Sequence, residues 1–392
     1  MNRLAAVVTC CSFLIATPAV AQQLSELTMP PNGDNQRAEV SQWIGLVKVT
    51  IAYHSPRVHL QGATDRTGHI WGDLVKYGFF DDGFGPSTAT PWRAGANETT
   101  TIGFSHDVKV EGKDVKAGTY GLFLEVKQNE PWTLILSKHL GWGSFQYDST
   151  NDVLRVPLSP QVAPFTEFLT YAFTDRLPSS SVAYLQWENT RVPFKIDVPN
   201  VNALYIAQIR QDLESWPGFN YQNWQRAAQF AVANKIALDD ALVWANKAIY
   251  QPFRNAALGR QDFTTFATKA SVLQALGRDA DADTTMDRAM HSEGASVIGI
   301  YQYGASVLAA GRKDRALDAF KLAHTLFPAD KFWPYVGLAR AYTALGDRKN
   351  AIASWETVLQ NVPPSQATAK PRFEAALKAL KAGSSTTEFA PK

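Results

Sequence analysis

Cysteine is nearly absent from the sequence: its 392 residues include two, Cys10 and Cys11, and both lie near the N-terminus. The segment that contains them resembles a secretory signal peptide, because Arg3 precedes an apolar run that ends before Ala19-Val20-Ala21, a typical cleavage site. Cleavage there leaves a mature chain without cysteine. Disulfides, thiolate metal sites and cysteine nucleophiles are then excluded together.

The sequence also lacks a long apolar stretch. The N-terminal run is shorter than the roughly 20 residues needed to span a bilayer, and no later stretch qualifies. A lipoprotein would need Cys10 or Cys11 as its acylated N-terminus, and Thr9 is a poor residue before such a cysteine. We therefore expect a soluble periplasmic or secreted protein that is cleaved after Ala21 and is not lipidated.

Neither charge sign dominates. The 38 Lys and Arg residues against 36 Asp and Glu give a net charge of +2, which argues against nucleic acid as the main partner. Several catalytic and nucleotide-binding motifs are absent, among them Gly-x-Ser-x-Gly, Ser-x-x-Lys, His-Glu-x-x-His and the phosphate-binding P-loop. The sequence predicts no cofactor, and an enzyme would have to assemble its site from distant residues.

Residues from about 46 to 198 have apolar side chains at every second position, which is typical of β-strands. Val47, Val49 and Ile51 alternate with polar neighbours, and Glu111-Gly112-Lys113-Asp114 has the composition of a hairpin turn. About nine short strands without helices between them predict an antiparallel β-sandwich or jelly roll.

Beyond residue 198 the apolar spacing becomes helical and the chain repeats itself. Leu276-Gly277-Arg278, Ala310-Gly311-Arg312 and Leu345-Gly346-Asp347 recur at intervals of 34 and 35 residues. Each Gly is followed by a small and then a bulky residue at fixed spacing: Ala282 and Met286, Ala316 and Phe320, Ala351 and Trp355. The period and these positions resemble the tetratricopeptide repeat, a helix–turn–helix unit.

The sequence therefore predicts an α+β multidomain protein, with an N-terminal antiparallel β-sandwich or jelly-roll domain followed by an all-α domain of tetratricopeptide-like repeats. We expect a signal peptide over 1–21, the β domain over 22–198, a helical linker over 199–225, the repeats over 226–382 and a disordered tail over 383–392.

Five of the seven histidines lie in the β half, and three of them are close in sequence to an aspartate. His54, His59 and His69 with Asp65 can be drawn as a metal site, but no pair has a diagnostic ligand spacing. A polar loop with scattered imidazoles is the favoured interpretation, so no metal site is predicted.

A loop at 91–99 is the strongest candidate for a ligand site. Trp92 can stack on a flat apolar face, Arg93 can hold a carboxylate, and Asn97 and Glu98 add an amide and an acid or base. The predicted ligand-binding set is completed by residues of similar segments: Arg66, Trp142, Tyr147 and Asp148. The structural alternative, in which Arg93 pairs with Glu98 and Trp92 fills the end of the sandwich, stays open.

Six segments of the β half together resemble a known family. They are Pro-Pro-Asn-Gly-Asp-Asn at 30–35, Ile-Trp-Gly-Asp-Leu-Val-Lys-Tyr-Gly at 70–78, Trp-Arg-Ala-Gly-Ala-Asn-Glu at 92–98, Ala-Gly-Thr-Tyr-Gly-Leu-Phe at 117–123, Trp-Gly-Ser-Phe at 142–145 and Val-Pro-Phe-Lys-Ile at 192–196. The region 24–198 resembles an exported bacterial family catalogued as domain of unknown function 2911. The resemblance implies a β domain followed by a helical repeat half, and it implies no established activity or catalytic residue.

Besides a purely structural role in the cell envelope, two functions remain open. The first is a cell-envelope binding or scaffolding protein, whose repeats receive a protein or peptide and whose β domain takes a small molecule or glycan. The positions expected to line the repeat groove are Thr264, Ala267, Ser271, Tyr301, Ala305, Leu308, Trp333 and Arg340. The alternative is an envelope hydrolase or lyase with its site at the Trp92–Glu98 loop, in which Glu98 and Asp148 form a carboxylate pair acting on a glycan.

Overall fold

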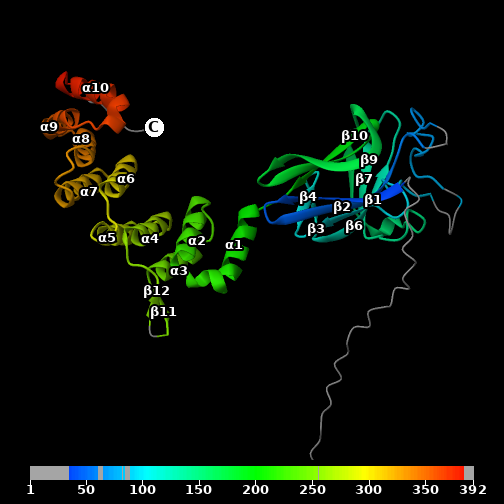
Figure 1. Cartoon of the computed structure of the whole chain (residues 1–392), viewed down its shortest axis with the longest axis horizontal. Coiled ribbons are helices and arrows are strands. Elements are labelled where there is room, and N and C mark those ends of the chain that lie inside the picture. Colours follow the sequence, from blue (N-terminus) through cyan, green and yellow to red (C-terminus); the bar gives the residue numbers. More distant parts are fainter. Residues whose placement is uncertain (1–34, 61–64, 82, 84–88, 255, 384–392) are drawn as a thin grey trace, which may run out of the picture. The chain divides into compact units, whose positions relative to one another are not determined.

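The computed structural model describes residues 35–60, 65–81, 83, 89–254 and 256–383 (Figure 1). The predicted signal peptide, residues 22–34 of the predicted β domain and residues 384–392 of the predicted tail lie outside these ranges. The chain divides into two compact units, residues 1–199 and residues 200–392. Each unit is described by itself.

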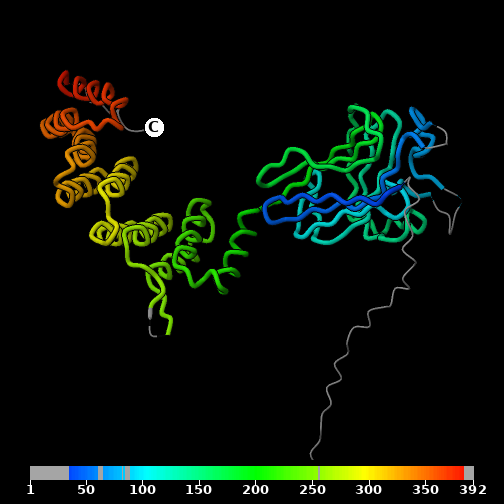
Figure 2. Tube along the Cα trace, viewed as in Figure 1, coloured from blue at the N-terminus to red at the C-terminus, as the bar shows by residue number. Residues whose placement is uncertain are grey.

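The first unit, here called the β unit, consists of two antiparallel sheets. Six strands pair in the order β1-β2-β3-β6-β7-β8 and four in the order β5-β4-β10-β9. Figure 2 shows the long hairpin of the last two strands in green. The strands are β1 (Asn35–Ile44), β2 (Val47–Pro56), β3 (Thr101–Phe104), β4 (Val108–Val110), β5 (Lys113–Val115), β6 (Gly118–Glu125), β7 (Trp132–Ser137), β8 (Asp152–Leu158), β9 (Gln161–Leu177) and β10 (Ser180–Asp197).

The apolar alternation in the sequence explains how the sheets pack. Val47, Val49 and Ile51 of β2 are fully buried, while the residues between them are part-exposed on the other face. The ring centroids of Tyr53 on β2 and Tyr171 on β9 lie 4.8 Å apart, so the buried faces of the two sheets meet. The predicted antiparallel β fold is confirmed, and its unequal sheets favour the sandwich over the jelly roll.

Two strands are much longer than the short strands expected from the sequence. β9 spans 17 residues and β10 spans 18. The register between them shifts around Glu188, which has a left-handed φ of 53°, and Asp175 near the end of β9 has a φ of 48°. In the sequence, the residues at these irregular positions break the apolar alternation and so suggest that a strand ends there. In the structure, the β9–β10 hairpin continues through these positions by means of β-bulges.

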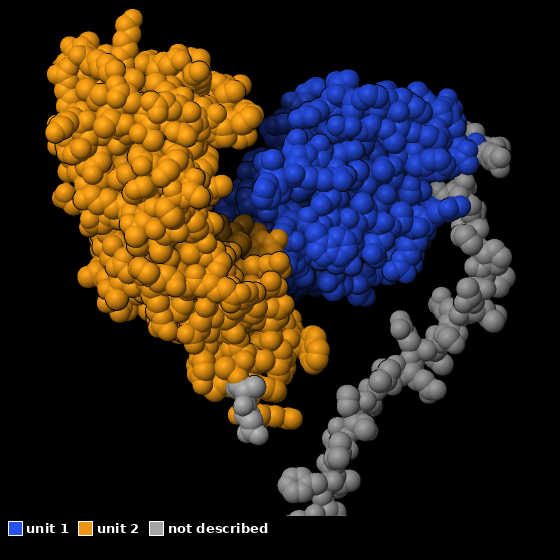
Figure 3. Space-filling view, turned by 60° about the vertical axis from the view of Figure 1, so that its left-hand side comes forward, with its two compact units in different colours: residues 1–199 blue, residues 200–392 orange. Residues whose placement is uncertain are grey.

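The second unit, here called the helical unit, is a series of antiparallel helix pairs; Figure 3 colours it orange and the β unit blue. The pairs are α2–α3, α4–α5, α6–α7 and α8–α9. The elements are α1 (Val201–Leu213), a 3-10 turn at Trp216–Phe219, α2 (Tyr221–Ala233), α3 (Leu238–Ile249), β11 (Gln251–Phe253), β12 (Ala256–Leu258), α4 (Phe263–Ala275), α5 (Asp279–Met290), α6 (Val297–Ala309), α7 (Lys313–Leu326), α8 (Trp333–Leu345), α9 (Arg348–Gln360), a 3-10 turn at Pro364–Ala369 and α10 (Lys370–Lys381).

Two details of the helical unit lie outside the predicted repeat pattern. Helix α2 begins at Tyr221, inside the segment 199–225 that the sequence predicts as a linker. The hairpin of β11 and β12 interrupts the series between α3 and α4, and it is not among the elements predicted from the sequence.

The three glycines of the repeat motif end the first helices of their pairs. Gly277, Gly311 and Gly346 have φ values of 73°, 82° and 80°, a left-handed conformation that glycine adopts without a Cβ clash. The alanines that follow are buried in the helix-to-helix contacts, and so are the bulky residues Met286, Phe320 and Trp355. The predicted tetratricopeptide-like repeats are confirmed by these positions.

Phe320 shows why the repeats need small residues opposite the bulky one. Its fully buried ring lies against Gly304 of α6 and Gly337 of α8, and a Cβ built at either glycine would overlap the ring. The ring therefore fills a space that the two backbones leave open between consecutive helix pairs.

We predict that Gly337→Ala destabilises the helical unit by about 1–3 kcal/mol, because overpacking outweighs the gain of about 1 kcal/mol in helix propensity. Urea unfolding followed by far-ultraviolet circular dichroism measures the change. Gln302→Ala, at an exposed position of α6, is the matched control and should lie within about 0.5 kcal/mol of wild type. Phe320→Leu combined with Gly337→Ala should recover part of the loss; a Gly337→Ala protein as stable as wild type would contradict this packing.

Candidate functional site

The loop at residues 91–98 is held against both sheets of the β unit. The backbone of Trp92 exchanges two hydrogen bonds with Leu124 of β6, at 3.0 and 2.8 Å. The hydroxyls of Thr100 and Tyr171 donate to the carbonyl oxygen of Ala94, at 3.1 and 2.9 Å. The backbone N–H of Ala96 donates to the carbonyl oxygen of His54, at 3.2 Å. The loop is thus fixed along its length by groups from several strands.

Trp92 of this loop belongs to a cluster of four tryptophans, whose other members come from outside the loop. The ring of Trp71 contacts Trp92, Trp132 and Trp187, with centroids 5.7, 4.8 and 5.9 Å apart. Trp187 is only 1% exposed, and the indole nitrogens of Trp71 and Trp187 are buried without a hydrogen-bond acceptor. Trp92 donates its indole N–H to the carbonyl oxygen of Gly95, at 3.1 Å. Trp92 is therefore both part of the packed cluster and part of the surface above it.

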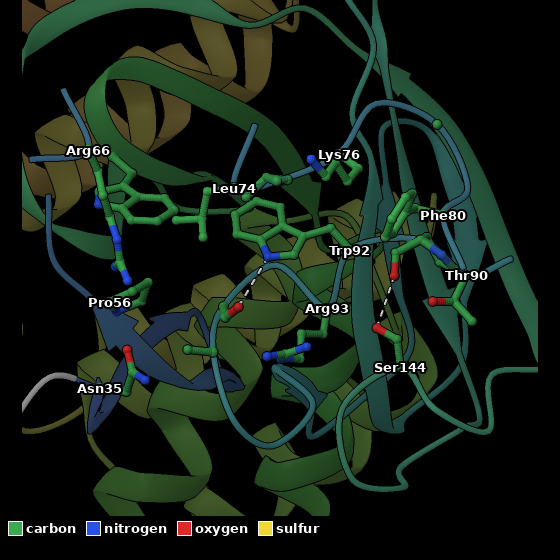
Figure 4. Close-up of a pocket in the computed structure, with 16 residues that line it drawn as sticks. Asn35, Pro56, Arg66, Leu74, Lys76, Phe80, Thr90, Trp92, Arg93 and Ser144 are labelled. Carbon is green, nitrogen blue, oxygen red and sulfur yellow. Dashed lines mark hydrogen bonds between the residues drawn. The ribbon is translucent and has the colours of Figure 1, made fainter. Parts of the chain in front are cut away.

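A cavity of about 300 Å³, here called the arginine pocket, opens beside Trp92 (Figure 4). Its cationic lining residues are Arg66, Lys76 and Arg93, and its tryptophans are Trp92 and Trp187; among the lining residues that the structure describes, none is Asp or Glu. The remaining lining residues are Asn35, Pro56, Leu74, Val75, Gly78, Phe80, Thr90, Pro91, Gly95, Ala96 and Ser144. In Figure 4 the guanidinium groups of Arg66 and Arg93 extend toward the side of the cavity where Pro56 and Asn35 lie.

A second cavity, of about 350 Å³ and here called the Trp142 pocket, uses the other end of the same loop. It is lined by Arg37, Ala52, Tyr53, His54, Glu98, Thr99, Thr101, Leu140, Gly141 and Trp142. His54 Nδ1 lies 3.0 Å from Glu98 Oε2. The sequence leaves open a pairing of Glu98 with Arg93; in the structure Glu98 pairs with His54, and Arg93 lines the arginine pocket.

Two of the predicted ligand-binding residues are occupied in structural contacts. The buried Tyr147 hydroxyl donates to Asp152 Oδ2 at 2.6 Å, and burial together with that carboxylate raises the pKa of Tyr147. Asp148 Oδ1 accepts from the backbone N–H of Thr150 and caps a short 3-10 turn at Ser149–Asn151, which lowers the pKa of Asp148. Asp148 lines neither pocket, so neither pocket contains the carboxylate pair with Glu98 that the alternative enzyme would need.

The predicted set is therefore divided. Arg66, Trp92 and Arg93 meet in the arginine pocket, whereas Glu98 and Trp142 meet in the other. Asn97 has a left-handed φ of 56° and lines neither cavity; its Oδ1 accepts from Asn35 Nδ2 at 3.3 Å. Several lining residues are not among the residues predicted from the sequence, and they include Arg37, His54, Lys76 and Trp187. Lys76 had a signal, because it belongs to one of the motifs that carry the family resemblance.

His54, His59 and His69 each lie beside at least one carboxylate. His54 pairs with Glu98, and His69 pairs with Asp73 at 2.9 Å. His59 Nδ1 lies 2.6 Å from Glu167 Oε2, and its other ring nitrogen lies 3.6 Å from Asp65 Oδ1. Within the described ranges, no group of three or more His, Cys, Asp and Glu side chains is arranged to hold a metal ion.

In the helical unit, three of the predicted groove residues contact one another. The rings of Tyr301 on α6 and Trp333 on α8 lie 4.8 Å apart between centroids, and Arg340 Nη1 donates to the Tyr301 hydroxyl at 2.8 Å. Arg340 Nη2 is buried without an acceptor. Thr264 and Ser271 of α4 are exposed, so the predicted surface continues onto the preceding helix pair.

Comparisons with known proteins find one family model that matches the β unit. Residues 35–196 match a model described as "Protein of unknown function (DUF2911)", which is the resemblance that the sequence motifs predict. No curated protein matches the chain. One solved structure, "MamA 41-end from Desulfovibrio magneticus RS-1", is 15% identical, with a TM-score of 0.27; the match covers 41% of this chain and 93% of that one. The repeat assignment rests on the helix pairs themselves.

The part of the chain that the structure describes contains no helix that is long and apolar enough to cross a membrane.

The contact between His59 and Glu167 predicts a pH dependence. Because Glu167 accepts a hydrogen bond from the imidazolium, it raises the pKa of His59, while the same contact lowers the pKa of Glu167. The ion pair of protonated His59 and ionised Glu167 therefore stabilises the fold most between about pH 4.3 and pH 6.5, the pKa values of an unperturbed Glu and His. This contribution is lost as pH rises through the folded pKa of His59, and it is also lost as pH falls through the folded pKa of Glu167. Glu167→Gln should lower the pKa of His59 in an NMR titration; Asp73→Asn, which changes a carboxylate beside another histidine, should leave it unchanged. A His59 pKa that Glu167→Gln does not move would contradict the assignment.

Proposed function

We propose that the chain is an exported binding protein, in which the arginine pocket of the β unit takes up a small anionic ligand and the helical unit holds a protein or peptide partner. The observation that carries the proposal is the character of the pocket: its described lining residues include three cations, and none of these described residues is Asp or Glu. Export rests on the predicted signal peptide and cleavage site.

The chemistry of the arginine pocket fits an oxyanion. Arginine presents its donors in a planar fork that matches a carboxylate, sulfate or phosphate group, and Lys76 adds a point charge at the exposed rim. Trp92 supplies a partly exposed ring against which the rest of the ligand can pack. A cavity of about 300 Å³ is at the small end of the usual range for ligand sites, so it suits a molecule of one or two rings.

The helical unit supports the second half of the proposal. Stacked helix pairs bury a continuous core and leave extended surfaces, which such proteins use to bind partners. Tyr301 and Trp333 are two part-exposed aromatic rings on adjacent helix pairs, and Arg340 beside them carries a charge. Aromatic residues and arginine are the types that contribute most to protein interfaces.

An envelope enzyme is the second candidate, because His54 and Glu98 form a close pair in an open pocket and could transfer a proton. If this is the function, Glu98→Gln should lower turnover of a glycan substrate by about 100-fold or more, without changing anion binding in the arginine pocket. Chromatography of glycans incubated with each protein gives the measurement. Equal product formation by wild type and Glu98→Gln would remove this candidate.

For the main proposal, we predict that phosphate, sulfate, citrate or galacturonate raises the melting temperature of the full mature protein, and that glucose does not do so through this pocket. Lys76→Gln should weaken binding of the active anion about 3- to 10-fold, since the lysine is exposed, and Arg93→Gln about 10- to 100-fold, since charged hydrogen bonds contribute about 1.5–3 kcal/mol. Isothermal titration at two salt concentrations measures both changes.

Lys138→Gln is the matched control, because Lys138 is an exposed lysine of the β unit outside both pockets. It should bind the anion as wild type does. The proposal fails if no anion in the panel binds, or if Lys76→Gln and Arg93→Gln bind it as tightly as Lys138→Gln.

A further inference from the structure

Trp142 is an exposed aromatic ring held in a fixed plane. Its exposed fraction is 61%, and its ring lies almost parallel to Phe145, with an interplanar angle of 7° and centroids 5.3 Å apart. The loop beneath is anchored by the hydroxyl of the buried Thr99, which lies 2.6 Å from the carbonyl oxygens of Gly141 and Gly143. A ligand that stacks on this indole therefore does not have to order it first, which lowers the entropic cost of binding.

The floor of the Trp142 pocket comes from neighbouring strands of one sheet. Arg37 of β1 lies directly opposite His54 of β2, and Ala52 of β2 lies directly opposite Thr101 of β3. Residues that pair across strands, or alternate along one strand, point to the same face, so all four side chains share the outer face of the sheet. The small side chain of Ala52 leaves room between polar neighbours.

The polar groups of this pocket are balanced in charge, in contrast to those of the arginine pocket. One guanidinium from Arg37 stands against one carboxylate from Glu98, and the carboxylate is shared with His54 at 3.0 Å. The pocket thus offers hydrogen-bond donors from Arg37, acceptors from Glu98, and a hydroxyl of Thr101 that can do either. Such a lining favours a neutral ligand with many hydroxyl groups over an ion of either sign.

From these contacts we propose that the Trp142 pocket is a sugar-binding site, which stacks one neutral hexopyranose ring of a glycan on the indole of Trp142. One face of a pyranose carries C–H groups that pack on an aromatic ring, while its hydroxyls at the edge reach Arg37, Glu98 and Thr101. The cavity volume of about 350 Å³ accommodates one or two such rings. The proposal concerns binding alone and does not depend on the anion site.

A protein partner fits this pocket less well. The exposed large apolar side chains of its lining are Trp142 and Leu140, at 61% and 53%. The area that these two side chains offer, in a concave and largely polar setting, is far smaller than the roughly 800 Å² that each partner buries in a standard interface. The geometry is that of a small-molecule site with one apolar wall and a few placed polar groups.

The test uses saturation-transfer NMR and isothermal titration on the full mature protein. The probes are the methyl pyranosides of glucose, galactose, mannose and N-acetylglucosamine, with a tetrasaccharide of each sugar; adenosine is the competing flat ligand. We expect at least one sugar to bind with a Kd of about 0.1–10 mM, as a shallow single-ring site allows. Trp142→Ala should weaken that binding at least 10-fold, while Trp142→Phe, which keeps an aromatic face, should stay within about 3-fold of wild type.

Two controls separate this site from the arginine pocket and from unfolding. Lys76→Gln should leave sugar binding unchanged, and the melting temperature of Trp142→Ala should stay close to that of wild type, since the residue is exposed. Arg37→Gln, which keeps an amide donor, should weaken sugar binding without changing the response to anions. The proposal is overturned if no sugar binds, if Trp142→Ala binds as wild type does, or if adenosine alone binds in a Trp142-dependent manner.

Discussion

The arginine pocket and the Trp142 pocket both depend on the position of the loop at 91–98, and the buried phenol of Tyr171 is central to that position. Tyr171 is 2% exposed; its hydroxyl donates to Ala94 O at 2.9 Å, and its backbone N–H donates to the hydroxyl of Tyr53 at 3.2 Å. One residue of β9 thereby joins β2 of the other sheet to the loop. Burial raises the pKa of Tyr171 well above its ordinary value, so the phenol stays neutral and remains a donor across the physiological pH range.

The repeat half of the fold follows from the sequence because its signals are local. A glycine with a left-handed φ, an alanine five residues later and a bulky residue four further on lie within about two helical turns of each other, and all serve one helix pair. The contact of Phe320 with Gly304 and Gly337 is less visible, because it joins three helices over 33 residues of sequence. The same limit applies to the hairpin of β11 and β12, whose short strands have too few residues to show a period.

The candidate site is predicted in part, for the same physical reason. Trp92, Arg93 and Arg66 stand in segments whose composition indicates a ligand, and the structure brings them together. Trp187 and Lys76 join them only through the pairing of distant strands and loops. Nothing in the local sequence distinguishes Asp148, which caps a turn, from Glu98, which lines a cavity, since both are carboxylates in loops rich in aromatic residues. Their difference lies in backbone geometry, which composition does not report.

That backbone geometry also explains how one short loop contributes to two pockets of different charge. Ala94 and Asn97 have φ values of 52° and 56°, conformations that cost a non-glycine residue free energy and persist only where surrounding contacts hold them. The contacts are present: Thr100 and Tyr171 bind the carbonyl of Ala94, and the carbonyl of His54 binds the N–H of Ala96. Turning the chain at these two residues leaves Arg93 on the side of Arg66 and Lys76, and places Glu98 beside His54. Glu98 and the three cationic residues of the arginine pocket thereby line separate cavities, so one cavity presents mainly cationic groups while the other presents groups of both signs.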